Sequence, residues 1–204
     1  MGSKSTVAGG SDTSDTPRPM RADAQRNRAR ILDAAEVVFA AEGIEVPVDT
    51  IAEKAGVGVG TLYRHFPTKE KLCEAILLER LASLAEDARS QADAADAGAA
   101  FFGFLNHMAD LSASKRDLIA AVMGAGIEFE EAAAPVKQDL IAAVGVLLAR
   151  AQSACVVRAD VTADTVVSLV VGTCQAAVAH ADSFPGDQLG NVLGIVCDGL
   201  RCHD

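Results

Sequence analysis

The stretch TIAEKAGVGVGTLYRHFPTKEKL, residues 50–72, decides the fold predicted for this chain. It opens with Thr50 and Glu53 in the spacing of a capping box, which starts a helix, and Gly56 is the residue type that most often ends one. A second helix is predicted over 59–66, because a proline follows it and disfavours helical backbone at the residue before. The stretch therefore indicates two short helices joined by a glycine-containing turn.

On both sides of this stretch the sequence predicts more helices. Apolar positions at helical spacing predict a helix over about 23–42, and Thr68 would cap a long helix that runs to about residue 91. Further helices are expected near 96–112, 116–124, 131–154, 162–181 and 187–201. The sequence contains no strand-like alternation and no Asn-Gly hairpin signal, so the predicted fold class is all-α.

The composition is typical of a globular helical protein. Half of the 204 residues are apolar but only 4% are aromatic, with no Trp, which predicts an aliphatic, alanine-rich core. The longest apolar candidate, residues 166–181, is interrupted by polar side chains, and the N-terminus lacks the apolar segment of a signal peptide. We therefore expect a cytoplasmic localisation, no membrane partner, and a disordered tail over residues 1–20.

The five cysteines are scattered along the chain and odd in number, which favours reduced, buried thiols over disulfides. A redox sensor or metal site is the less favoured alternative, because Cys197, Cys202 and His203 match no zinc-binding spacing. We therefore expect neither a metal nor another cofactor.

The net charge of −10 is unevenly distributed. Residues 18–80 hold ten Lys and Arg against ten Asp and Glu, whereas residues 81–204 hold seven against sixteen. At the start of the first segment, five arginines lie in 18–30 with Asp23 as the only acidic residue. This basic arm indicates a local contact with a polyanion, and the alternative is a solvated, charged helix start.

The sequence matches none of the common catalytic or phosphate-binding motifs. Gly56, Gly58 and Gly60 form G-x-G-x-G, which is neither the dinucleotide fingerprint nor a P-loop. The Glu-x-x-His pairs of helical metal sites and the H-E-x-x-H and G-x-S-x-G patterns of hydrolases do not occur. The carboxylates in EFEEAAAP, residues 128–135, are more typical of a helix start than of acid–base chemistry. We expect a protein that is not an enzyme.

The remaining candidate is a helix-turn-helix motif, whose second helix enters the major groove of DNA. Gly58, Gly60 and Thr61 would keep the start of that helix slim, and the polar side chains around it would contact phosphate oxygens. Leu62 and Phe66, four residues apart, would instead face the first helix as core. The predicted DNA-binding residues are Arg26, Thr50, Gly58, Val59, Gly60, Thr61, Tyr63, Arg64, His65 and Lys69.

Residues 27–72, from NRARILDAAEVVFAAEG through TIAEKAGVGVGTLYRHFPTKEKL, closely resemble the DNA-binding domain of TetR-type transcriptional repressors. The resemblance implies a dimer of nine- or ten-helix subunits with an N-terminal DNA-binding domain over 21–67. It also implies a ligand-binding and dimerisation domain over 68–204, coupled through the fourth helix. Carried over by position, Thr50, Thr61, Tyr63, His65 and Lys69 would contact DNA. The chain departs from the pattern at Gly58, where many family members have a Ser or Thr whose hydroxyl can reach phosphate.

Two groups of C-terminal residues are candidates for binding an effector and a second subunit. Aromatic, Met and polar side chains predict an effector pocket at Phe101, Phe104, His107, Met108, Met123, Ile127, Phe129 and Gln175. Small residues and an apolar stripe predict a four-helix dimer interface at Ser168, Gly172, Ala176, Leu189, Leu193, Val196 and Leu200. For both groups the alternative is an ordinary core within one subunit.

The function expected from these features is a homodimeric repressor that binds a near-palindromic operator in double-stranded DNA. A small, mostly apolar effector would release it. The alternative is a helical small-molecule-binding protein or enzyme whose N-terminal helices serve only assembly.

Overall fold

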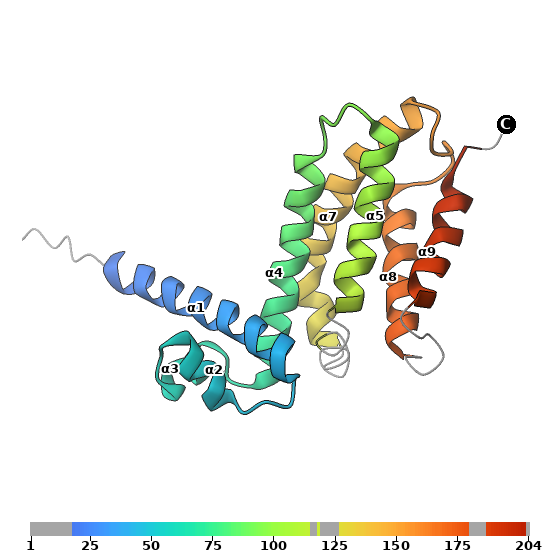
Figure 1. The fold of residues 1–204 in the computed structure, drawn as a ribbon. Coiled ribbons are helices and arrows are strands. Elements are labelled where there is room, and N and C mark those ends of the chain that lie inside the picture. Colours follow the sequence, from blue (N-terminus) through green and yellow to red (C-terminus); the bar gives the residue numbers. More distant parts are fainter. Residues whose placement is uncertain (1–17, 115–117, 119–126, 180–186, 203–204) are drawn as a thin grey trace, which may run out of the picture.

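The computed structural model describes residues 18–114, 118, 127–179 and 187–202, and in these residues the chain forms eight helices and no extended strand (Figure 1). The helices are α1 (Arg18–Glu42), α2 (Val48–Ala55), α3 (Val59–His65), α4 (Lys69–Ser90), α5 (Ala97–Ser114), α7 (Ile127–Ser153), α8 (Ala163–Ala179) and α9 (Asp187–Leu200). The predicted all-α fold class is confirmed.

Two apolar cores divide the structure, and α4 takes part in both. Helices α1 to α3 enclose a small core with residues such as Ile31, Ile51 and Leu62. Helices α5, α7, α8 and α9 lie side by side with α4 as a bundle around a larger core. Ile76 near the start of α4 belongs to the small core, and Leu84 farther along belongs to the large one. Helix α4 is therefore the long connection that the sequence predicts.

The start of α2 differs from the prediction. The helix begins at Val48 with Pro47 at its N-cap, and no side chain caps it. The N–H of Thr50 donates to the Pro47 carbonyl at 3.2 Å, inside the first turn. Pro47 already has the extended backbone that an N-cap needs (φ −60°, ψ 143°), so the helix starts two residues earlier. The predicted capping box between Thr50 and Glu53 is wrong.

The other expected helix signals hold. Gly56 ends α2 in the left-handed conformation, with φ 65°. The Thr68 hydroxyl accepts a hydrogen bond from the Lys71 N–H at 3.2 Å and so caps α4. Helix α1 begins at Arg18, earlier than the expected start near residue 23. Helix α7 begins at Ile127, earlier than the expected start at residue 131, and it contains Pro135. The helix expected near 116–124 lies outside the described residues, except for the buried Leu118.

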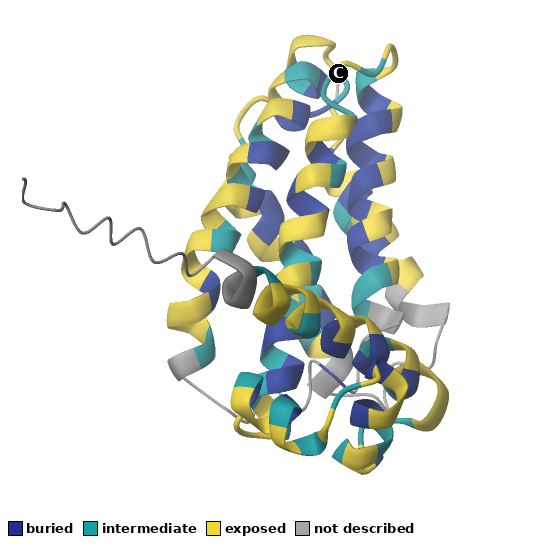
Figure 2. Ribbon diagram, turned by 90° about the vertical axis from the view of Figure 1, so that its left-hand side faces the viewer, coloured by how far each residue is buried: buried dark blue, intermediate teal, exposed yellow. Residues whose placement is uncertain are grey.

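Helix α7 is the one described helix that is long and apolar enough to cross a membrane, over Phe129–Ser153 with a mean hydropathy of 1.5. A single helix of this kind is weak evidence, because the core helix of a soluble protein passes the same test. Leu140, Val144 and Leu147 of α7 are buried in the large core, and buried and exposed positions alternate along the bundle helices (Figure 2). In all, 33% of the apolar window of this helix is buried inside the structure.

Candidate DNA-binding surface and effector pocket

The second helix of the motif, α3, is fixed to its scaffold by two residues. Leu62 and Phe66 are buried in the small core together with Ile31 and Ile51, as the sequence predicts. The guanidinium carbon of Arg28 on α1 lies 5.5 Å from the centre of the Phe66 ring, within range of a cation–π interaction. These contacts hold α3 against α1 and so fix which of its faces points outward.

The outward face of α3 carries polar side chains and open space. Tyr63 is 47% exposed and Arg64 is also exposed. A Cβ atom added at Gly58 or Gly60 would have no neighbour within 4 Å, so the start of the helix is free to approach another molecule. Gly58 is the N-cap of α3, and because glycine has no side chain, no side-chain hydrogen bond caps this helix. The geometry therefore presents the slim helix start that major-groove entry requires.

The other predicted contact residues are less freely exposed. Thr50, Thr61 and His65 are half-buried, and Val59 is partly buried against the small core. Lys69 is also half-buried, because its Nζ donates to the Val46 carbonyl at 2.9 Å and lies 6.0 Å from the centre of the Phe39 ring. The lysine thus joins the start of α4 to the segment between α1 and α2, a structural contact that the sequence does not indicate.

Arginines of α1 border this surface. Arg30 lies beside the turn between α2 and α3, since its Nη1 is 3.8 Å from the Cβ position of Gly56. Arg26 is exposed and pairs with Asp23, and Arg30 donates to Asn27 Oδ1 at 2.6 Å. Exposed ion pairs of this kind add little stability, so exchanging Asp23 for a phosphate would cost Arg26 little.

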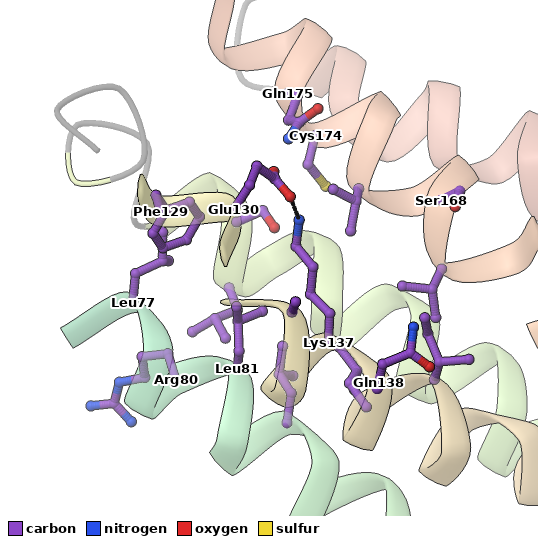
Figure 3. Close-up of a pocket in the computed structure, with 18 of the residues that line it drawn as sticks. Leu77, Arg80, Leu81, Phe129, Glu130, Lys137, Gln138, Ser168, Cys174 and Gln175 are labelled. Atoms are coloured by element: carbon purple, nitrogen blue, oxygen red, sulfur yellow. Dashed lines mark hydrogen bonds and ion pairs between the residues drawn. The ribbon is translucent and has the colours of Figure 1, made fainter. Parts of the chain in front are cut away.

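A cavity of about 350 Å³ lies in the bundle between α4, α5, α7 and α8 (Figure 3). Its walls are mostly apolar, with side chains such as Leu81, Ile141 and Val171. The volume is within the range of small-molecule sites. Burial raises the pKa of the Cys174 thiol in its wall, a change that a hydrogen bond with Ser112 opposes.

Two ion pairs involve residues that line this cavity. Lys137 Nζ donates to Glu130 Oε2 at 2.6 Å, within α7. Arg80 contributes to the wall from α4 while its guanidinium is paired with Glu36 of α1, with Nε donating to Oε1 at 2.6 Å. This hydrogen bonding with Glu36 raises the pKa of Arg80. In the part of the chain that the structure describes, no group of three or more His, Cys, Asp or Glu side chains is placed to hold a metal ion.

Comparisons with known proteins agree with this architecture. Residues 31–76 match the family model for bacterial regulatory proteins of the tetR family, and residues 96–202, more than half of the chain, match the model for the C-terminal domain of SbtR-like transcriptional regulators. The crystal structure of a TetR transcription regulatory protein from Mycobacterium vanbaalenii is 40% identical in sequence, covers 90% of this chain and 99% of its own, and superposes with a TM-score of 0.64. The chain belongs to the TetR family.

Further relatives support the assignment of this TetR-family chain. A TetR transcriptional regulator from Streptomyces coelicolor is 28% identical, with a TM-score of 0.62 and coverage of 87% of this chain and 99% of its own. An HTH-type transcriptional regulator of Staphylococcus aureus (strain USA300) is 49% identical over 55 residues, which is 26% of this chain and 30% of the relative. The match thus spans less than a third of that relative's length. The protein is a transcriptional regulator with a DNA-binding helix-turn-helix, and not an enzyme.

In this TetR-family structure the cavity lies against the DNA-binding domain. Leu77 of α4 and Phe129 of α7 line the cavity and also pack against the small core. Arg80 adds a polar contact, since it lines the cavity and is paired with Glu36 of α1. A molecule in the cavity would therefore touch side chains that also contact the DNA-binding domain.

The structure places the predicted effector-binding residues apart from one another. Phe129 and Gln175 line the cavity. Phe101, Phe104 and Met108 are instead buried in the large core, which was the alternative for them, because their side chains fill the space between the helices. His107 is exposed, with Nε2 3.5 Å from Asp87 Oδ2. Met123 and the side chain of Ile127 lie outside the described residues.

Four charged residues line this cavity although the sequence does not indicate them as effector-binding: Arg80, Glu130, Lys137 and Asp164. Glu130 and Lys137 are seven positions apart, two helical turns on one face, so their pairing could have been read from the sequence. Arg80 and Glu36 are 44 positions apart, and no local pattern relates them.

The predicted dimer residues also divide into two groups. Ser168, Gly172 and Ala176 are exposed on α8, and Ser168 also lines the cavity. Leu193 and Leu200 of α9 are buried in the subunit's own core, and Val196 is partly buried against it. The side chain of Leu189 is not described. Two exposed apolar side chains of α8 and α9 were missed, namely Leu169 (44%) and Ile195 (72%).

Proposed function

We propose that this TetR-family regulator is a homodimeric repressor that binds a near-palindromic operator and is released by a small, mostly apolar effector. The observation that carries the proposal is the placement of the cavity, whose wall residues Leu77 and Phe129 also pack on the core of the DNA-binding domain. A ligand at such a site can bias the position of the helix-turn-helix.

On the DNA side, α3 would enter the major groove with Gly58, Gly60 and Thr61 leading. Tyr63, Arg64 and His65 on α3, together with Thr50, Lys69 and Arg26, would bind phosphates and fix the register. Two copies of α3 in a dimer would read major grooves about 34–36 Å apart, which requires a near-palindrome.

The dimer would form through the exposed faces of α8 and α9. Ile195 of α9 is 72% exposed, and the exposed Leu169 and the small Gly172 lie on the neighbouring helix α8. A two-fold axis between the subunits would make a four-helix interface from these two helices. The proposed interface therefore keeps Ser168, Gly172 and Ala176 and replaces the buried leucines of α9 by Ile195.

Effector binding would shift α4 relative to α1 and change the distance between the two copies of α3. Coupling between sites in one protein is typically about 1–3 kcal/mol, and moving a population from 1:99 to 99:1 needs about a 10⁴-fold preference for one state. The effector must therefore bind the form that cannot bind DNA much more tightly than the form that can.

The test is selection of bound duplexes from a random DNA pool by the purified full-length chain, followed by footprinting. The expected result is a near-palindrome with half-sites one helical turn apart, whose affinity falls steeply with salt because phosphate contacts release counterions. Recovery of single half-sites, or a flat salt response, would contradict the proposal.

A further inference from the structure

Four charged residues line the mostly apolar cavity in the bundle, namely Arg80, Glu130, Lys137 and Asp164, and two of them, Lys137 and Glu130, are paired with each other. Lys137 extends from α7 into the space between α4, α7 and α8, and Figure 3 shows its ammonium group directed to the Glu130 carboxylate. Glu130 lies two turns before Lys137, so the long lysine side chain runs back along its own helix. Ala134, on the same face between them, is small enough to leave room for it.

The two partners of this pair are not equally buried. The Lys137 side chain is 32% exposed, whereas Glu130 is 63% exposed. Glu130 can therefore turn into water at little cost, because an exposed carboxylate is solvated there. Lys137 is the less exposed partner and is held over apolar walls, where a charge without a partner costs more than it does in open water. The pair is asymmetric: the cation stays and the anion is exchangeable.

We propose that the cavity binds an amphiphile with a single carboxylate, whose head group replaces Glu130 on Lys137. This inference rests on the proposed function, in which the same cavity is the effector site. The apolar body of the ligand lies along Leu77, Leu81 and Phe129 on one side and Ile141 and Val171 on the other. Lys137 is paired with one carboxylate before the exchange and with one after it. The bound state therefore contains no unpaired ion whose desolvation would oppose binding.

The other two ligand classes fit less well. A cationic amphiphile that paired with Glu130, the more solvated partner, would leave Lys137 without an anion. A neutral alcohol would not replace Glu130 on Lys137, so it would gain only apolar contact with the cavity walls. A carboxylate gains the same apolar contact and a charge-assisted hydrogen bond in place of one that is partly exposed to water.

The test is calorimetric titration of the full-length chain with three probes that share one tail: dodecanoate and dodecyltrimethylammonium, each below its critical micelle concentration, and dodecan-1-ol, below its solubility limit. A charge-assisted hydrogen bond corresponds to roughly a tenfold or larger change in Kd, so dodecanoate should bind at least about tenfold more tightly than the alcohol. K137M should remove this preference of the cavity for the carboxylate over the alcohol. E130Q should tighten dodecanoate binding, because it weakens the internal competitor.

Two matched variants control for net charge. D139N removes a carboxylate from α7 at a position that pairs with Arg89 outside the cavity, and R158M removes a cation that pairs with Asp160. Neither should change the affinity for dodecanoate. If D139N tightens binding as much as E130Q does, a general charge effect explains the result and the proposed exchange is refuted.

The remaining outcomes separate this inference from the proposed function. Equal affinity for all three probes, with no effect of K137M, would overturn the carboxylate assignment. Preferential binding of the cation, lost in E130Q, would reverse the charge assignment and equally overturn it. A gel-shift assay without probe is run in parallel: if the chain binds an operator but not dodecanoate, only this inference fails. If dodecanoate binds as expected and no duplex is bound, the ligand class stands and the proposed repressor fails.

Discussion

Arg80 of α4 and Glu36 of α1 form a two-pronged ion pair between the bundle and the DNA-binding domain. Arg80 Nε donates to Glu36 Oε1 at 2.6 Å, and Nη2 is paired with Oε2. The side chains are 39% and 17% exposed, so the pair is partly shielded from water. The pair thereby joins α4 to α1. Arg80 lies one helical turn after Leu77 on α4, and both residues line the cavity.

We expect this pair to couple the two parts of the chain measurably. A double-mutant cycle with Glu36→Gln and Arg80→Met should give an interaction free energy of about 1 kcal/mol in urea unfolding, after allowance for the exposure of Arg80. The same cycle on the more exposed Arg89–Asp139 pair, with side chains 40% and 51% exposed, serves as the control and should give a value near zero. Equal interaction free energies in the two cycles would show that the Arg80–Glu36 pair contributes no more to stability than an ordinary exposed ion pair.

Tyr63→Ala should weaken operator binding by roughly tenfold and leave the melting temperature nearly unchanged, because one phosphate or base contact is lost while an exposed side chain contributes little to the core. Gel-shift titration and thermal unfolding measure the two effects. Tyr63→Phe isolates the hydroxyl and should lose part of the affinity. An unaltered affinity in the alanine variant would remove Tyr63 from the proposed interface.

Ile195→Asp should convert the proposed dimer into a monomer. The change places a charge on an apolar side chain that is 72% exposed in the single subunit but would be buried between two copies. Analytical ultracentrifugation gives the mass. Val37→Asp, at a side chain that is 54% exposed on α1, is the matched control and should leave the mass unchanged. A dimeric Ile195→Asp variant would place the subunit contact elsewhere.

The cysteines should differ in reactivity. Cys155 and Cys202 are exposed, whereas burial raises the pKa of Cys73 from 9.0 to about 11 and also raises that of Cys174 and Cys197. A thiol-specific reagent at pH 8 should therefore modify two thiols quickly in the native chain and five after unfolding. Because the folded pKa of Cys73 is the higher one, its contribution to stability is complete below pH 9.0 and is lost as the pH rises toward about 11. Rapid modification of Cys73 in the native chain would contradict its burial.

The sequence predicted the features that depend on neighbouring residues. Gly56 and Thr68 end and begin helices through local backbone geometry, and the spacing of Leu62 and Phe66 indicates which side of α3 is buried. It failed where the outcome depends on contacts between distant segments. The apolar spacing along α5 looks the same whether Phe101 and Phe104 line a cavity or fill a core, and only the packing of the neighbouring helices decides between them.

The dual role of Leu77 and Phe129 has a consequence for redesign. These two side chains are shared between the ligand and the DNA-binding domain, so replacing them to admit a new compound would also alter the unliganded regulator. Val167 and Val171 on α8 border the same cavity but pack only on the bundle core. Libraries intended to turn the chain into a sensor for other compounds should therefore vary the α8 wall and keep the α4 and α7 wall fixed.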